Sequence, residues 1–174
     1  MQSDAELVAA VLAGQREVFA DLVGRYYRAV RATALAVVRD HHTAQDVAQD
    51  TFVAAYEKLR ALRDGSAFGA WLLQIARRQA VNAAKRGPRT EPLNATDLQA
   101  GAERDGQLDA ASQELLAAVA RLPEQERTVV MLKYFAGHKA PDIAEMTSRP
   151  LGTVASQLSR ARERLRGWLK EFGP

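Results

Sequence analysis

The stretch "PDIAEMTSRPLGTVASQLSRARERLRGWLKEF", Pro141 to Phe172, decides how the end of this chain folds. A first helical turn tolerates proline, so Pro141 predicts a short helix over about 141–148. A longer helix is predicted over about 151–172, because apolar side chains recur there at near-heptad spacing. Only Ser148, Arg149 and Pro150 separate the two helices. A short helix, a tight turn and a longer helix together are the signature of a helix-turn-helix.

The longer helix also has a polar face, which is a candidate DNA-reading surface. Short polar side chains come first along this face and arginines come later, an order that suits a DNA groove. Its members are Thr153, Ser156, Gln157, Arg160 and Arg164.

Upstream of this motif the chain again predicts helices. Two are expected over about 109–121 and 123–136, the second ended by Gly137. Residues 87–108 are rich in Gly, Pro and polar residues and poor in large apolar ones, which predicts a flexible linker. The sequence therefore predicts a C-terminal helical domain over 109–174 behind a linker over 87–108.

The N-terminal part, 1–86, predicts four more helices, over about 4–13, 16–39, 44–62 and 67–86. Thr43 and Ser66 are expected to cap the last two. Side chains predicted to point inward are Val47, Ala48, Phe52, Ala55, Tyr56, Leu59 and Leu62 in the third helix and Phe68, Trp71, Leu72 and Ile75 in the fourth. No run of alternating β-branched residues predicts a strand. The expected fold is all-α, with two small helical domains.

Two surface faces of the N-terminal domain stand out by charge. Asp46, Gln49, Asp50, Val53 and Glu57 share an exposed, acidic face of the third helix. Between Asp64 and Glu91 the chain has no acidic residue, yet it holds five cations, a balance that suits a polyanion. These are Arg77, Arg78, Lys85, Arg86 and Arg89.

Composition excludes several classes of function. The 174 residues carry a net charge of +3 and no cysteine, which excludes disulfides, thiolate zinc sites and thiol nucleophiles. The spacing of His41, His42 and Asp46 suggests a metal site, because residues four positions apart on a helix can bind the same metal ion. Adjacent histidines point apart, however, so solvated loop histidines are expected. No phosphate-binding glycine loop or nucleophile elbow occurs. No cofactor is therefore expected. No apolar run approaches the length of a membrane span and the first residues are acidic, so no membrane insertion and a cytoplasmic location are expected.

Three segments together resemble bacterial RNA polymerase sigma factors of the extracytoplasmic-function (ECF) group, within the sigma-70 family. They are "DVAQDTFVAAYEKL" (46–59), "FGAWLLQIARRQAVNAAKR" (68–86), and "LPEQERTVVMLKYFAGHKAPDIAEM" followed by "PLGTVASQLSRARERL" (122–165). The resemblance implies a transcription initiation factor that binds core RNA polymerase and directs it to specific promoters. It implies no enzymatic activity.

The resemblance also implies roles for particular positions. Asp46, Gln49, Asp50 and Val53 match the face that docks on the coiled coil of the polymerase β′ subunit. Residues matching the surface that recognises and opens the minus-ten element are Ser66, Arg77, Arg78, Asn82, Lys85 and Arg86. Residues 109–174 match the domain that contacts the β flap and reads the minus-thirty-five element, through Arg149, Thr153, Ser156, Gln157, Arg160 and Arg164. An anti-sigma factor is expected as a further partner.

The helix-turn-helix departs from the family's usual pattern. Ala155 and Gln157 stand where cations are common, Ser148 where glycine is usual and Arg149 where an apolar residue is usual. Ser148 is therefore expected to adopt a positive φ, and Arg149 either replaces a lost phosphate contact or marks a remodelled turn. These departures leave open a sigma-like decoy that binds polymerase or an anti-sigma factor without reading promoters. An ordinary helix-turn-helix repressor accounts for residues 123–169 but leaves 16–86 unexplained.

Overall fold

The computed structural model describes residues 2–86 and 110–170, and every regular element in these two ranges is helical. The first range holds α1 (Asp4–Leu12), α2 (Phe19–Val38), α3 (His41–Lys58) and α4 (Phe68–Arg86). The short helices η1 (Arg16–Val18), η2 (Leu59–Ala61) and η3 (Gly65–Ala67) join them. The all-α prediction is confirmed for these residues, while the predicted linker lies outside them.

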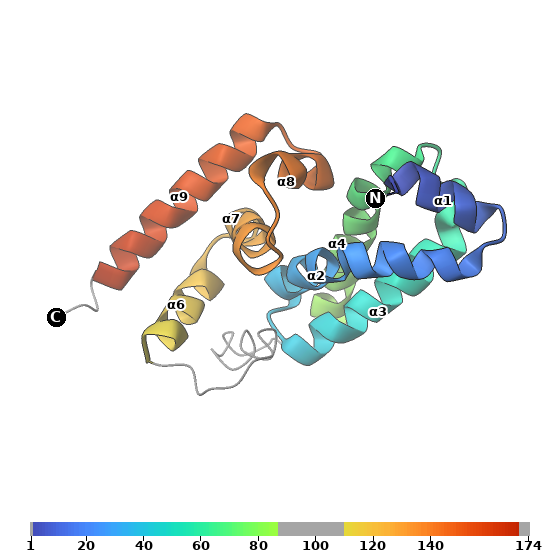
Figure 1. Ribbon diagram of the computed structural model, residues 1–174. Coiled ribbons are helices and arrows are strands. Elements are labelled where there is room, and N and C mark those ends of the chain that lie inside the picture. The colour runs from blue at the N-terminus through green and yellow to red at the C-terminus, as the bar shows by residue number, and fades with distance from the viewer. Residues whose placement is uncertain (1, 87–109, 171–174) are drawn as a thin grey trace.

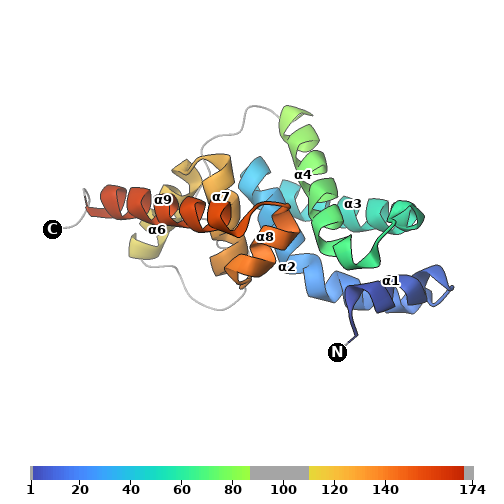
Figure 2. The same ribbon diagram turned by 90° about the horizontal axis from the view of Figure 1, so that it is seen from above.

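Helix α2 is the centre of the N-terminal part. It packs against both α3 and α4, and Leu22, Val30 and Leu35 are among its buried residues. Figure 2 shows α4 crossing over α2 and α3. Phe68 and Leu72 of α4 are fully buried, as predicted, whereas Trp71 and Ile75 are half-buried against the same core. This packing leaves the outer faces of α3 and α4 exposed.

The second described range holds α6 (Ala110–Arg121), α7 (Glu124–Val130), the π-helix η4 (Met131–Phe135), α8 (Ala140–Thr147) and α9 (Leu151–Lys170). Helix α9 packs against α6, α7 and α8 through Val154, Leu158 and Ala161. Figure 1 places α7 and α8 between α9 and the first four helices. Packing of α7 and η4 on α2, and of α8 on α4, therefore brings the two helical parts together.

Two predicted helix caps and one predicted inward side chain are wrong, and in both caps an aspartate two or three residues earlier accepts the hydrogen bond. Asp40, and not Thr43, caps α3: its Oδ2 accepts a hydrogen bond from the Thr43 backbone N–H at 2.7 Å. Similarly, Ser66 does not cap α4, because Asp64 accepts from the Ser66 N–H at 2.9 Å and forms η3. Tyr56, predicted to point inward, is exposed and packs edge-on against Phe19.

The helix predicted over 123–136 is interrupted, since it changes from α to π geometry at Met131. By contrast, the strained turn is confirmed. Ser148 has φ 53° and ψ 42°, and ends α8 through its backbone N–H. The left-handed conformation lets α9 begin three residues later at an angle to α8, as a helix-turn-helix requires.

Candidate functional site

The acidic face of α3 is open to solvent. Asp46, Gln49 and Asp50 are exposed, and within residues 2–86 and 110–170 their side chains make no hydrogen bond or ion pair. Val53 lies beside them on the same face with 58% of its surface exposed, the largest value among the large hydrophobic residues that the structure describes. Buried Val47, Ala48 and Phe52 hold the opposite side of the helix. An apolar side chain beside unpaired carboxylates is suited to docking a partner that carries positive charge.

Helix α4 presents the predicted minus-ten residues together. Arg77, Arg78, Asn82, Lys85 and Arg86 are exposed on its outer surface, and Ser66 is exposed just before its start. Gln79 ties α4 to α3: its Nε2 donates to the Asp50 carbonyl at 3.3 Å, and its Oε1 accepts from Thr51. The basic surface of α4 is thus fixed relative to the acidic surface of α3.

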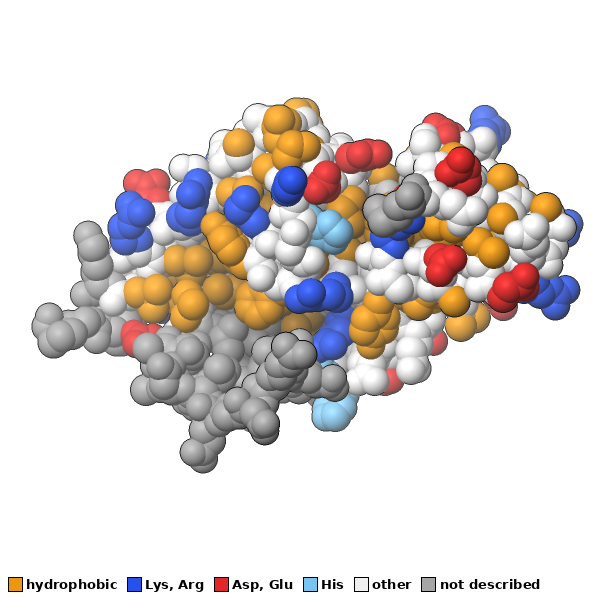
Figure 3. All heavy atoms as spheres, in the orientation of Figure 1, with side chains coloured by type: hydrophobic (Ala, Val, Ile, Leu, Met, Phe, Trp, Pro, Cys, Tyr) orange, Lys and Arg blue, Asp and Glu red, His pale blue; other side chains and the backbone are white. Residues whose placement is uncertain are grey.

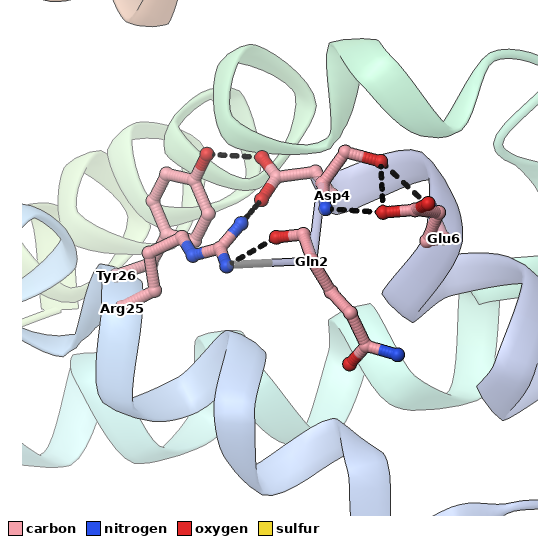
Figure 4. Close-up of polar contacts among 6 residues, drawn as sticks. Gln2, Asp4, Glu6, Arg25 and Tyr26 are labelled. Atoms are coloured by element: carbon pink, nitrogen blue, oxygen red, sulfur yellow. Dashed lines mark hydrogen bonds and ion pairs between the residues drawn. The ribbon is translucent and has the colours of Figure 1, made fainter.

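Close packing fixes the start of α4 on α2. A Cβ at Gly69 would lie 2.7 Å from the Tyr26 hydroxyl, so only glycine lets Tyr26 lie over this turn. Tyr26 and Arg25 both bond Asp4, and Arg25 also donates to the Gln2 carbonyl at 2.8 Å (Figure 4). Burial, followed by the Asp4 contact, raises the pKa of Tyr26. The first residues of the chain thereby brace the position of α4.

The predicted minus-thirty-five residues on α9 differ in exposure. Ser156, Arg160 and Arg164 are exposed and Thr153 is half-buried, but Gln157 has only 3% of its surface exposed. Its Oε1 accepts from Arg149 Nη1 at 3.2 Å, and its Nε2 donates to Gln125 Oε1 at 3.1 Å. Burial lowers the pKa of the half-buried Arg149, with nearby Arg77 adding to the effect. Gln157 is therefore covered by other side chains in this structure.

Glu126 of α7 holds the two arginines of α9. This buried carboxylate lies 3.1 Å from Arg164 Nε and 3.8 Å from Arg160 Nε. Figure 3 shows basic side chains following α9, and acidic ones gathering toward the α1 end of the same face. The buried Glu126 thus aligns the two arginines of the predicted minus-thirty-five face of α9.

Three arginines join the two helical parts. Arg127 is 3% exposed and donates through Nε to the Ala36 carbonyl at 2.6 Å and through Nη1 to the Leu122 and Ala120 carbonyls at 2.7 and 3.0 Å. Burial lowers its pKa to about 10, so it stays charged at neutral pH. Arg28 donates to the Phe135 carbonyl at 2.7 Å. Arg77 Nε and Nη2 lie 3.1 and 3.0 Å from Glu124 Oε1.

A cleft of about 890 Å³ lies between α8 and the start of α4. Ser66, Gly69 and Ala70 line one side, and Asp142, Glu145 and Met146 line the other. His138 also faces this cleft, and burial lowers its pKa. Ser66, one of the predicted minus-ten residues, therefore lies opposite α8.

Comparison with known proteins places this arrangement in a family. Residues 22–90 match the family model "Sigma-70 region 2", and residues 112–165 match "Sigma-70, region 4". The chain is 34% identical to the RNA polymerase sigma-H factor of Pseudomonas aeruginosa, over 93% of this chain and 91% of that one. It is 33% identical to the ECF RNA polymerase sigma-E factor of Haemophilus influenzae, over 92% of each. The chain belongs to the ECF sigma factors.

Two solved structures resemble this sigma factor. CnrH, in complex with the cytosolic domain of CnrY, matches with a TM-score of 0.73 and 23% identity over 99% of this chain and all of that one, a likeness of fold. The sigma factor RpoE from Bartonella quintana, in complex with the anti-sigma factor NepR, matches with a TM-score of 0.60 and 28% identity over 87% of this chain and 96% of that one. Like its family, this sigma factor is a transcription initiation factor.

Sequence reasoning missed four consecutive residues of this sigma factor, Glu124 to Arg127. They lie within the quoted "LPEQER" segment, but periodicity gives no sign that Arg127 is buried or that Glu124 reaches α4. The one available signal was composition, since two acids and an arginine in a first helical turn leave a charge to be paired. These residues contact Ala36, Arg77 and the α9 face, so they organise both predicted DNA surfaces.

The expectation of solvated loop histidines is wrong for His41 of this sigma factor. His41 is buried at the start of α3, with Nε2 2.9 Å from Arg31 Nη2, and its ring packs edge-on against His42. Within the described ranges no group of three His, Asp or Glu side chains is placed to hold a metal ion. No helix there has both the length and the apolar character needed to cross a bilayer.

Proposed function

We propose that this sigma factor binds core RNA polymerase through the α3 face, and DNA through the outer face of α4 and the start of α9. The carrying observation is the α3 face itself: Asp46, Gln49 and Asp50 lie beside exposed Val53, and none of the three polar side chains is used inside the described structure. A docking surface that combines complementary charge with an apolar contact has this arrangement. The β′ coiled coil is the proposed partner of this face, and the β flap that of the C-terminal part.

The proposed minus-ten surface is the exposed set Arg77, Arg78, Asn82, Lys85 and Arg86 together with Ser66. Cations that follow the backbone of an opened strand, beside a loop that receives an unstacked base, supply what promoter opening needs. The proposed minus-thirty-five surface comprises Arg149, Thr153, Ser156, Arg160 and Arg164, with Gln157 beneath them.

We infer that the two parts separate when DNA is bound. The minus-ten and minus-thirty-five elements are named for their positions, which lie roughly 25 base pairs apart. At about 3.4 Å per base pair, this separation is about 85 Å of duplex. In this structure Arg77 of the minus-ten surface pairs with Glu124, which lines the same pocket as Gln157 and Arg160 of the other surface. One closed molecule cannot span both elements, so the contacts made by Arg77, Arg28 and Arg127 across the two parts must open.

We further propose an anti-sigma factor as the partner of the closed form, a cytoplasmic location and no catalytic activity in this chain. The solved complex of a sigma factor with NepR supports the first of these, since its sigma factor resembles this chain in both sequence and fold.

In vitro transcription tests the proposal. The purified chain is mixed with bacterial core polymerase and host genomic DNA, and the 5′ ends of the new RNAs are sequenced. Discrete start sites that share an upstream motif are the expected result. Tight core binding without any discrete start site would contradict promoter reading and would favour the decoy.

A further inference from the structure

The start of α9 carries little positive charge of its own. Residues 151–160 contain one cation, Arg160, and this residue faces the Glu126 carboxylate 3.8 Å away. A helix that enters a DNA groove by its first turns needs phosphate contacts nearby to fix its register. Arg149, two residues before α9 begins, is the cation that lies nearest in sequence to the first turn of this helix.

Arg149 differs from Arg160 and Arg164 in its partner. No carboxylate of the described residues lies within ion-pair distance of its guanidinium, which instead donates to the amide oxygen of Gln157. An amide orients a guanidinium without neutralising its charge. Arg149 therefore keeps a full positive charge in a fixed place at the turn.

Gln157 is held in turn by Gln125. The buried Gln157 amide uses its oxygen for Arg149 and its nitrogen for Gln125 Oε1, so a chain of two hydrogen bonds runs from the first turn of α7 to the turn before α9. A buried amide that is satisfied at both ends has one orientation, because flipping it would place two donors or two acceptors together. Gln125 thus fixes the direction of the Arg149 side chain indirectly, through its hydrogen bond to Gln157.

We propose that Arg149 is the phosphate-contacting cation at the start of the recognition helix, and that Gln157 and Gln125 are positioning residues that aim it. This inference rests on the proposed function and reassigns Gln157 from reading DNA to orienting Arg149. It also gives Gln125, which carried no role in the sequence prediction, a part in upstream recognition.

A double-mutant cycle tests the proposal in the holoenzyme, on a promoter fragment identified by the transcription experiment. The variants are Arg149→Ala, Gln157→Leu and the two combined, with affinity measured over a range of salt concentrations. Arg149→Ala should weaken binding about tenfold and reduce the slope of log K against log salt by about 0.9, the value for one phosphate contact. Gln157→Leu should weaken binding about threefold with an unchanged slope, since the charge stays but is no longer aimed.

The combined variant shows whether Gln157 acts through Arg149. If Gln157 acts through Arg149, Gln157→Leu costs nothing further once Arg149 is removed. An equal loss in both backgrounds would show a structural role for Gln157 and overturn the positioning assignment. Gln125→Leu changes an exposed residue, so this variant should fold even if Gln157→Leu does not. It too should weaken DNA binding only when Arg149 is present.

Two further variants separate charge at this position from charge in general. Arg149→Lys should restore the salt slope, because it keeps one cation at the turn. Arg162→Ala removes an exposed arginine of α9 outside the predicted DNA face and should leave the slope unchanged. A slope unaffected by Arg149→Ala, or reduced equally by Arg162→Ala, would overturn the proposal while leaving the promoter function standing. A wild-type holoenzyme that binds no promoter would overturn both.

Discussion

The acidic face of α3 and the polar face of α9 differ in how their side chains are held. On α3, Asp46, Gln49 and Asp50 are exposed, and their side chains make no hydrogen bond or ion pair within the described ranges. On α9, Gln157 is buried between Gln125 and Arg149, while Arg160 and Arg164 share the Glu126 carboxylate. The α3 face needs only a helix to exist, whereas the α9 face needs α7 packed against it.

This difference has a consequence for how each surface fails. A substitution on α3 should act locally, through the charge or shape that the partner meets. A substitution on α9 or α7 should instead spread along the polar contacts that connect them. The two faces can therefore be separated by asking which variants show coupling and which act alone.

The largest effect is expected from reversing charge on α3. Asp46→Lys combined with Asp50→Lys should lower affinity for core polymerase at least about a hundredfold, because like charges then meet at a docking surface that was complementary. Fluorescence anisotropy with labelled sigma factor and purified core enzyme measures this. Glu163→Lys, on the exposed side of α9, is the matched control and should leave core affinity unchanged. Wild-type affinity for the double variant would remove α3 from the polymerase interface.

A smaller effect, confined to DNA, is expected on α4. Arg78→Ala combined with Asn82→Ala should leave core binding intact and reduce promoter opening about tenfold, since both side chains are exposed on the face assigned to the minus-ten element. Permanganate reactivity of unpaired thymines reports opening directly. Loss of core binding and opening together would point to misfolding of α4, and normal opening would contradict its assignment.

The sequence predicts these two faces unequally well, for physical reasons. A face that depends only on helical spacing, such as Asp46, Gln49, Asp50 and Val53, follows from a period of 3.6 residues. The burial of Gln157 does not follow, because it depends on Gln125, 32 positions earlier in the chain. The same holds for Arg127, whose carbonyl partner Ala36 lies 91 positions away.

Local errors at helix starts have a similar origin. Thr43 and Ser66 are both good capping residues, yet Asp40 and Asp64 accept the hydrogen bonds. Both members of each pair suit the position by type, and only the backbone conformation decides between them. The positive φ of Ser148 was predictable because the resembling family usually has glycine at this position, and the structure confirms it.

The contact between Arg77 and Glu124 links the two parts and tests whether the closed form restrains α4. Arg77 is exposed and Glu124 is half-buried at the surface, so the pair contributes less than about 1 kcal/mol. Glu124→Gln should raise the open fraction by no more than about fivefold, since Arg28 and Arg127 still join the parts. Because the chain has no cysteine, dyes placed at Arg63→Cys and Arg166→Cys report the distance by energy transfer.

Salt provides the control for this experiment. High ionic strength should open wild-type protein toward the Glu124→Gln value and leave the variant itself little changed, because an exposed pair is screened. Glu163→Gln removes an acid from α9 that pairs with no described residue, and should behave as wild type. Identical energy transfer in wild type and Glu124→Gln at every salt concentration would remove this pair from the control of opening.

The smallest effect concerns the helix start that supports the α3 face. The hydrogen bond with Thr43 holds the pKa of Asp40 below its usual range, so this cap stabilises the fold above the unfolded pKa of about 3.9 and is lost as pH falls through the lower folded value. Asp40→Ala should reduce the free energy of unfolding at pH 7 by about 1 kcal/mol in urea titration, whereas Asp40→Asn, an equally good cap without a charge, should lose little. Core affinity should change less than about twofold, because Asp46 lies beyond the first turn that the cap orders. A larger loss of core affinity would mean that the α3 face, like the α9 face, depends on contacts outside its own surface.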